Sequence, residues 1–171
     1  MWEAVSRGLP VCLYRPGNIG PHSVTGKGNP RDLQGMIIDA CCKVGYAPSG
    51  VSWKFEMTPV DILVKAISCF ATSPSHYGRV YNIVQQETLP ARTVFDLMCD
   101  MDLISGYTPI AKWKSKLATR SDATGERVLS LLAESLSELE SQLSMPGKYD
   151  CSGFQEAMSS WDIPCPPIKA G

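Results

Sequence analysis

The stretch Leu9–Gly28, LPVCLYRPGNIGPHSVTGKG, decides the fold class of this chain of 171 residues. It opens with Leu9–Tyr14, a short continuous apolar run that is typical of a strand covered on both faces. The following segment, Arg15–Gly28, contains six glycines or prolines in fourteen residues, which predicts an irregular loop. Loops of this length are uncommon in compact domains and are more often functional than decorative. The stretch therefore predicts a buried strand that leads into a candidate functional loop.

Helices and strands alternate on both sides of this stretch. Residue patterns predict helices over 2–7, 29–44, 58–71, 93–101 and 129–143, and strands over 9–14, 53–57 and 79–84. We expect Asn29 and Thr58 to cap their helices, because short polar side chains accept hydrogen bonds from the first free N–H groups. Apolar and charged residues alternate over 53–57, so Lys54 and Glu56 are expected on a wet face of that strand.

The last third of the chain has a helical pattern. Basic residues cluster over 112–120, and leucines then repeat at three- and four-residue spacing over 129–143. The repeat predicts a helix packed on its own domain, because a coiled coil would need a partner and at least three uninterrupted heptads. The order of elements predicts an α/β fold with few strands and a helical C-terminal subdomain. Three strands are few for this length, which suggests a piece of a larger fold.

The composition argues against several classes of protein. The chain has 16 basic and 17 acidic residues and a net charge of −1, so a clustered basic face for nucleic acid is not expected. With 44% apolar residues, it is also unlike a disordered chain. No apolar run approaches the roughly 18 residues of a membrane helix, and residues 1–8 lack the pattern of a signal peptide. We therefore expect a cytoplasmic protein with no membrane or nucleic-acid partner.

Cysteine usage and short motifs reveal no complete active site. The seven cysteines include no C-x-x-C pair, and most lie in apolar stretches, where a thiol behaves as a small hydrophobe. The sequence has no G-x-S-x-G, H-E-x-x-H, phosphate-binding or G-x-G-x-x-G motif. His22 and Ser23 are adjacent, a spacing that rarely gives nucleophile–base geometry. The residues alone therefore predict no catalytic residue and no metal site.

The loop carries a more specific pattern. The loop and the four residues after it, Arg15–Asp32, resemble the segment R-P-G-x-x-x-x-x-S-x-T-G-x-x-N-x-x-D of thioester reductase domains. These are extended short-chain dehydrogenases/reductases found in nonribosomal peptide synthetases, polyketide synthases and alpha-aminoadipate reductase. Met57–Asp61 resembles the M-x-P-V-D helix start of that family, and Gly78–Ile83 its G-x-V-[FY]-[HN]-[IL] strand. Tyr149–Ser152 with Ile163–Pro166 resembles its closing segment, so the likeness covers nearly the whole chain in order.

This resemblance implies a Rossmann-like fold and NADPH- or NADH-driven reduction of a thioester on a phosphopantetheinyl carrier protein, giving an aldehyde or alcohol. It also implies that the nucleotide loop and the catalytic Tyr-x-x-x-Lys lie upstream of residue 1. We therefore expect one truncated domain over 1–171, the substrate-side C-terminal half of a reductase. Its last sheet strands and substrate loop would lie in 1–84 and a mostly helical subdomain in 85–171. Alone it would hold no cofactor, be inactive, and need the missing N-terminal half as a partner.

Roles in the loop follow from the same resemblance. Pro16, Gly17 and Ile19 would lie against the cofactor, and Asn18, His22, Ser23 and Thr25 would line the substrate channel. Arg15 and Asp61 are expected to form a pair that joins the strand to the next helix. Two alternatives remain open: another extended reductase or epimerase that shares the turn, and a non-catalytic module of the same fold that binds a carrier or partner.

Overall fold

The computed structural model describes residues 2–85, 87–145 and 147–163. These residues divide into two compact units, each assembled from separated segments of the chain. Unit 1 comprises the described parts of 1–29, 56–88 and 148–168, and unit 2 comprises 30–55 and the described parts of 89–147. Pro164, Cys165 and Pro166, which belong to the expected closing segment, lie outside the described residues.

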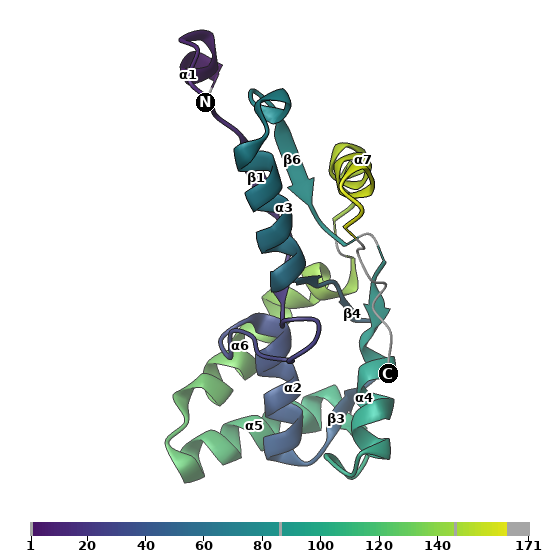
Figure 1. The fold of residues 1–171 in the computed structure, drawn as a ribbon. Helices are drawn as coiled ribbons and strands as arrows, with labels where there is room; N and C mark the ends of the chain where they lie inside the picture. Colours follow the sequence, from purple (N-terminus) through teal and green to yellow (C-terminus); the bar gives the residue numbers. More distant parts are fainter. Residues whose placement is uncertain (1, 86, 146, 164–171) are drawn as a thin grey trace. The chain divides into compact units, whose positions relative to one another are not determined.

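Unit 1 is built on a parallel pair of strands. Its elements are α1 (Trp2–Ser6), β1 (Leu13–Pro16), β2 (Ile19–Gly20), β5 (Thr58–Pro59), α3 (Val60–Thr72), the 3-10 turn η1 (Pro74–His76), β6 (Val80–Ile83) and α7 (Ser152–Ser160). β1 pairs with β6 in parallel, with Leu13 opposite Val80 and Pro16 opposite Ile83. β2 and β5 form a second, two-residue parallel pair. Figure 1 shows β6 between α3 and α7.

One apolar cluster holds these elements of unit 1 together. Alternate residues of β6, Tyr81 and Ile83, are buried against α3 and α7. The ring of Phe70 from α3 is fully buried and stacks on Tyr81 with centroids 4.0 Å apart. Offset stacking and edge contacts of this kind add about 0.5–1.5 kcal/mol each to the area that is buried. The core therefore fixes β1 and β6, and with them the point where the chain leaves β1.

Unit 2 is mostly helical. Its elements are α2 (Leu33–Val44), β3 (Ala47–Ser49), β4 (Lys54–Phe55), β7 (Leu89–Pro90), α4 (Ala91–Asp100), β8 (Tyr107–Pro109), α5 (Ile110–Thr124) and α6 (Arg127–Ser144). β3 and β8 pair in parallel, and β4 and β7 pair antiparallel. Trp113 of α5 is fully buried, and its indole N–H donates to the carbonyl oxygen of Tyr46 at 2.8 Å. None of the described helices combines the length and apolar character of a membrane span.

The order of elements confirms the α/β class, and two boundaries differ for clear physical reasons. The first strand begins at Leu13 instead of Leu9, since Pro10 has no N–H for a strand ladder and the carbonyl of Val11 is used by the N–H of Gly78. The helix expected from Asn29 begins at Leu33, and its N-cap is Asp32, whose carboxylate accepts from the N–H of Gly35 at 2.8 Å. The prediction that Asn29 caps this helix was therefore wrong.

Candidate functional site

The candidate site is the turn where the chain leaves β1. Because β1 and β6 are parallel, this turn lies at the carboxyl end of the pair, where open α/β sheets place their ligands. The N–H of Gly17 donates to the carbonyl oxygen of Ile83 at 3.0 Å and so extends the ladder by one residue. Pro16 and Asn18 are exposed on either side of Gly17, and the side chain of Ile19 is 42% exposed. The turn is thus anchored through its backbone and presents its side chains outward.

A buried carboxylate lies under the turn. Glu56 is only 6% exposed, and its Oε2 accepts two hydrogen bonds from Asn18, one from the backbone N–H and one from the side-chain Nδ2, both at 3.1 Å. The carboxylate also packs on Gly17, where a Cβ would lie only 2.8 Å from Oε2. Burial raises the pKa of Glu56 above its ordinary value, and the hydrogen bonds from Asn18 oppose that shift. Gly17, Asn18 and Glu56 therefore form one packed unit.

Glu56 is a site residue that the sequence pattern assigned to the wrong environment. The alternation over 53–57 predicts it on a wet face together with Lys54, and only Lys54 is exposed. The strand β4 ends at Phe55, so the period of two no longer holds at Glu56. The polar side chain of Asn18, at the end of an apolar strand, was a signal that such a partner could exist.

Backbone hydrogen bonds continue the contact between the loop and the segment after Glu56. The carbonyl oxygen of Asn18 accepts from the N–H of Thr58 at 2.8 Å, and Ile19 then lies opposite Thr58 in the β2–β5 pair. Thr58 is fully buried, and its hydroxyl oxygen accepts from the N–H of Gln85 at 3.1 Å. The N-cap of α3 is Pro59, without a side-chain hydrogen bond, so the prediction that Thr58 caps the helix was wrong. Thr58 instead links the loop segment to the segment after β6.

A second carboxylate holds the far part of the loop. Asp61, in the first turn of α3, accepts from the backbone N–H of Ser23 at Oδ1 and from its hydroxyl at Oδ2, both at 2.8 Å. The backbone N–H of Ser23 is the main reason why the pKa of Asp61 lies below its ordinary value. The imidazole of His22 lies nearby, with its Nδ1 3.9 Å from Oδ1 of Asp61, and no described ion pair joins Asp61 to Arg15. The expected pairing of Arg15 with Asp61 was therefore wrong.

The tip of the loop is closed by its own hydrogen bonds. The backbone of His22 exchanges two bonds with this turn, since its N–H donates to the carbonyl of Lys27 and its carbonyl accepts from the N–H of Gly26, both at 2.9 Å. The His22 Nδ1 accepts from the N–H of Val24 at 3.1 Å, and Thr25 Oγ1 accepts from the N–H of Lys27 at 3.4 Å. The structure thus gathers the seven predicted site residues into two places, Pro16–Ile19 at the turn above Glu56 and His22–Thr25 at the loop tip, where Ser23 and His22 lie beside Asp61.

The chemistry of these residues suits binding. The Ser23 hydroxyl donates to a carboxylate instead of an imidazole, so Ser23 and His22 do not form a nucleophile–base pair. No three His, Cys, Asp or Glu side chains come together as a metal site among the residues that the structure covers. Cys41 and Cys151 are buried, and burial raises the pKa of both thiols, as for small hydrophobes of a core.

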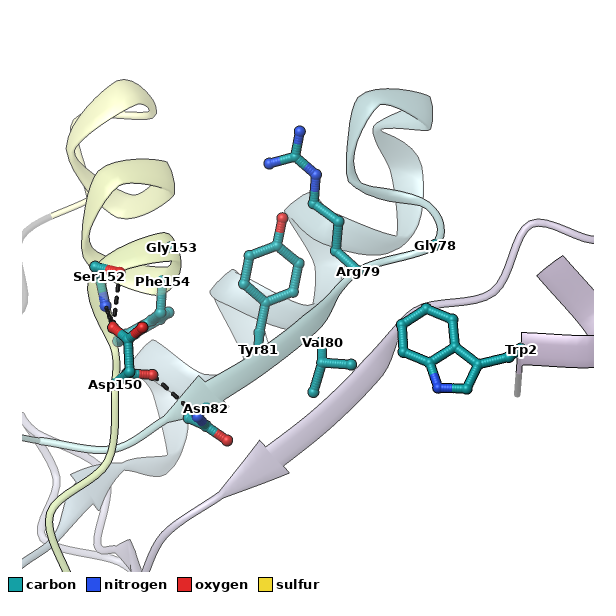
Figure 2. Close-up of a pocket in the computed structure, with 10 residues that line it drawn as sticks. All are labelled: Trp2, Gly78, Arg79, Val80, Tyr81, Asn82, Asp150, Ser152, Gly153 and Phe154. Carbon is teal, nitrogen blue, oxygen red and sulfur yellow. Dashed lines mark hydrogen bonds between the residues drawn. The ribbon is translucent and has the colours of Figure 1, made fainter.

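A separate cleft of about 490 Å³ lies beside β6, also in unit 1. Figure 2 shows Trp2 on one side of Val80, and Ser152–Phe154 at the start of α7 on the other side of Tyr81. The Asn82 Nδ2 donates to the carbonyl oxygen of Asp150 at 2.9 Å, and the Asp150 carboxylate accepts from the N–H and hydroxyl of Ser152. None of the predicted site residues lines this cleft.

Comparisons with known proteins agree on one family. The NAD-binding family model described as male sterility protein matches residues 1–67. The chain is 37% identical over 125 residues to the non-canonical nonribosomal peptide synthetase FrzA of Cladobotryum sp, covering 68% of this chain and 12% of FrzA. It is 32% identical over 123 residues to the glycine betaine reductase ATRR of Emericella nidulans, covering 72% of this chain and 9% of ATRR.

A solved structure matches over nearly the whole chain. It is the terminal R domain from the myxalamid PKS-NRPS biosynthetic pathway, with a TM-score of 0.79 and 28% identity, covering 98% of this chain and 43% of that one. The chain therefore spans less than half of the solved domain and a small part of the curated relatives. The mixed α/β arrangement, the strand-end turn and these matches confirm the resemblance seen in the sequence. The chain belongs to the terminal reductase domains of the extended short-chain dehydrogenase/reductase family.

Proposed function

We propose that this chain provides the substrate side of an NADPH- or NADH-dependent thioester reductase. In the complete domain, a thioester on a phosphopantetheinyl carrier protein would be reduced and released as an aldehyde or alcohol. The observation that carries the proposal is the turn after β1, which stands at the ligand-binding end of a parallel strand pair and is held from below by Glu56. Relatives named as a nonribosomal peptide synthetase and a reductase support the same activity.

The turn fits the flat ring of a nicotinamide. Pro16 has no N–H, the N–H of Gly17 is used by Ile83, and the N–H of Asn18 is used by Glu56. Three successive residues therefore offer no free backbone donor, which favours an apolar ring face against the turn. A bound NADPH or NADH supplies the hydride, and Pro16, Gly17 and Ile19 would keep its ring in place and exclude water from that side.

The rest of the loop would meet the acyl and phosphopantetheine groups. Asn18, His22, Ser23 and Thr25 are the residues we assign to this role, through their exposed or half-exposed polar side chains. The two hydrogen bonds from Ser23 to Asp61 hold this part of the loop against α3, so that a ligand would meet a formed surface. A preformed loop loses less conformational entropy when a ligand binds.

The test is a fusion that supplies the remainder of the domain. The part of the myxalamid R domain that precedes its match to this chain is joined ahead of residue 1, and the oxidation of NADPH and of NADH is followed by absorbance. We expect turnover with an acyl thioester on a carrier protein and none with a nucleotide sugar. Turnover of the nucleotide sugar alone would indicate a different extended reductase, and a folded fusion that binds carrier protein without turnover would indicate a non-catalytic module.

A further inference from the structure

We propose that Glu56 is a positioning residue that turns the Asn18 carboxamide so that its oxygen faces the ligand, where it accepts a hydrogen bond from an N–H or O–H group. The inference rests on the proposed function and adds which partner accepts the hydrogen bond and which donates it. It assigns the ligand a donor at this point, and it assigns Glu56 a role although Glu56 itself is buried beneath the turn.

The geometry of Asn18 carries the first step. An ionised carboxylate can only accept hydrogen bonds, so the end of the Asn18 amide that meets Glu56 Oε2 at 3.1 Å is the Nδ2 donor. The backbone N–H of Asn18 meets the same oxygen at 3.1 Å, which fixes the residue at two points. With Nδ2 directed to Glu56, the Oδ1 atom is the end that is left for other partners.

The exposure of Asn18 carries the second step. Asn18 is exposed, and within the described residues its side chain makes no hydrogen bond besides the one to Glu56. Its Oδ1 is therefore an acceptor that none of the described residues uses, at the carboxyl end of the strand pair. An amide oxygen at that place recognises a donor and disfavours a carbonyl or a carboxylate.

The surroundings of Glu56 explain why it can hold this position. The carboxylate packs on Gly17, where even a single methyl group would lie within 3.0 Å of both of its oxygens. The backbone of Gln85 lowers the pKa of Glu56 and so, like Asn18, opposes the effect of burial. Glu56 is thus confined by Gly17 and held by the two hydrogen bonds from Asn18, so its orientation does not depend on a ligand.

Two ligand groups offer the donor that this oxygen requires. One is the carboxamide NH2 of the nicotinamide, and the other is an amide N–H of the pantetheine arm. Both present the same N–H chemistry, and they can be separated by analogues. A reduced cofactor with an acetyl group in place of the carboxamide lacks the first donor, and a pantetheine thioester methylated on its amide nitrogens lacks the second.

The first experiment tests the orientation of the amide in the chain itself. In isotope-labelled protein, exchange of the Asn18 side-chain NH2 with water is followed by NMR, and the NH2 of Asn82, bonded to Asp150, serves as the internal control. We expect exchange of the Asn18 group to accelerate about tenfold in Glu56→Ala, and less in Glu56→Gln, whose oxygen can still accept. Equal exchange in wild type and both variants, with Asn82 unchanged, would overturn the assigned role of Glu56.

The second experiment tests the donor in the fused enzyme. In wild type, one of the two analogues should raise KM about tenfold, the effect of about one lost hydrogen bond, with little change in kcat. The same analogue should change KM little in Asn18→Ala, and the affected analogue identifies the donor. If each analogue raises KM by the same factor in Asn18→Ala as in wild type, the inference is overturned. A wild-type fusion that shows the expected amide exchange but reduces no thioester would refute the proposed function instead.

Discussion

Replacement of Gly17 with alanine should destabilise unit 1, because the site has no room for a Cβ. The new atom would lie 2.8 Å from Oε2, 3.0 Å from Oε1 and 3.2 Å from Cδ of Glu56, so the carboxylate would have to retreat by about half an ångström. Glu56 is held by two hydrogen bonds from Asn18, and bonds to a charged group contribute about 1.5–3 kcal/mol each. Because a retreat lengthens these bonds without abolishing them, we expect a loss of about 1–3 kcal/mol.

Urea unfolding of the chain, followed by circular dichroism, measures this loss. Gly153→Ala is the matched control in the same unit, since its Cβ would meet Tyr81 at an ordinary contact of 3.6 Å and alanine favours the helix. Glu56→Asp shortens the acid by one methylene, so its combination with Gly17→Ala should lose about 1 kcal/mol less than the two single losses added. An unchanged free energy of unfolding in Gly17→Ala, or a loss in the double variant equal to the sum of the two single losses, would refute the steric explanation.

Four further outcomes are expected. Burial raises the pKa of Glu56 when the chain folds, so the free energy of unfolding falls as the pH rises from the unfolded to the folded pKa. Glu56→Gln cannot ionise, so its melting temperature should rise relative to that of wild type when melts are compared from about pH 4 to 8. Phe70→Ala should cost about 3–5 kcal/mol in urea unfolding, because its fully buried ring lies at the centre of an aromatic cluster. Asp32→Ala removes the N-cap of α2 and should cost about 1 kcal/mol by the same measurement. Fluorescence titration of the chain with NADPH should show no micromolar binding, because the sequence contains no glycine-rich phosphate loop.

Regular patterns in the sequence predicted most of the helices of the fold. The leucine repeat corresponds to α6, where Leu129, Leu132 and Leu136 are buried, and the glycine-terminated apolar run corresponds to α2. α5 was overlooked because its basic residues dominated the pattern, although Trp113 and Leu117 are buried at a spacing of one helical turn. The pairs β2–β5 and β4–β7 have only two residues in each strand, too few for any periodicity to appear.

Prediction of the candidate site reached the loop and missed what supports it. The glycines and prolines after β1 mark the turn, because they act through the local backbone. The partners Glu56 and Asp61 lie 38 residues further along the chain from Asn18 and Ser23, and only the fold brings them together. A local pattern also suggested the wrong partner for Thr58, since a helix start offers nearby N–H groups, whereas the Thr58 hydroxyl accepts from Gln85 in a distant segment.

The division of the chain into two interleaved units has a consequence for recombination between related reductases. In the described residues, the chain passes from one unit to the other at 29–30, 55–56, 88–89 and 147–148. A crossover at a single point between 30 and 147 would join non-matching parents inside at least one unit. A crossover between 30 and 80 separates β1 from β6, and one between 49 and 107 separates β3 from β8. To inherit unit 2 intact, a chimera must exchange both 30–55 and 89–147. Homologous exchange should therefore tend to keep the two segments from the same parent.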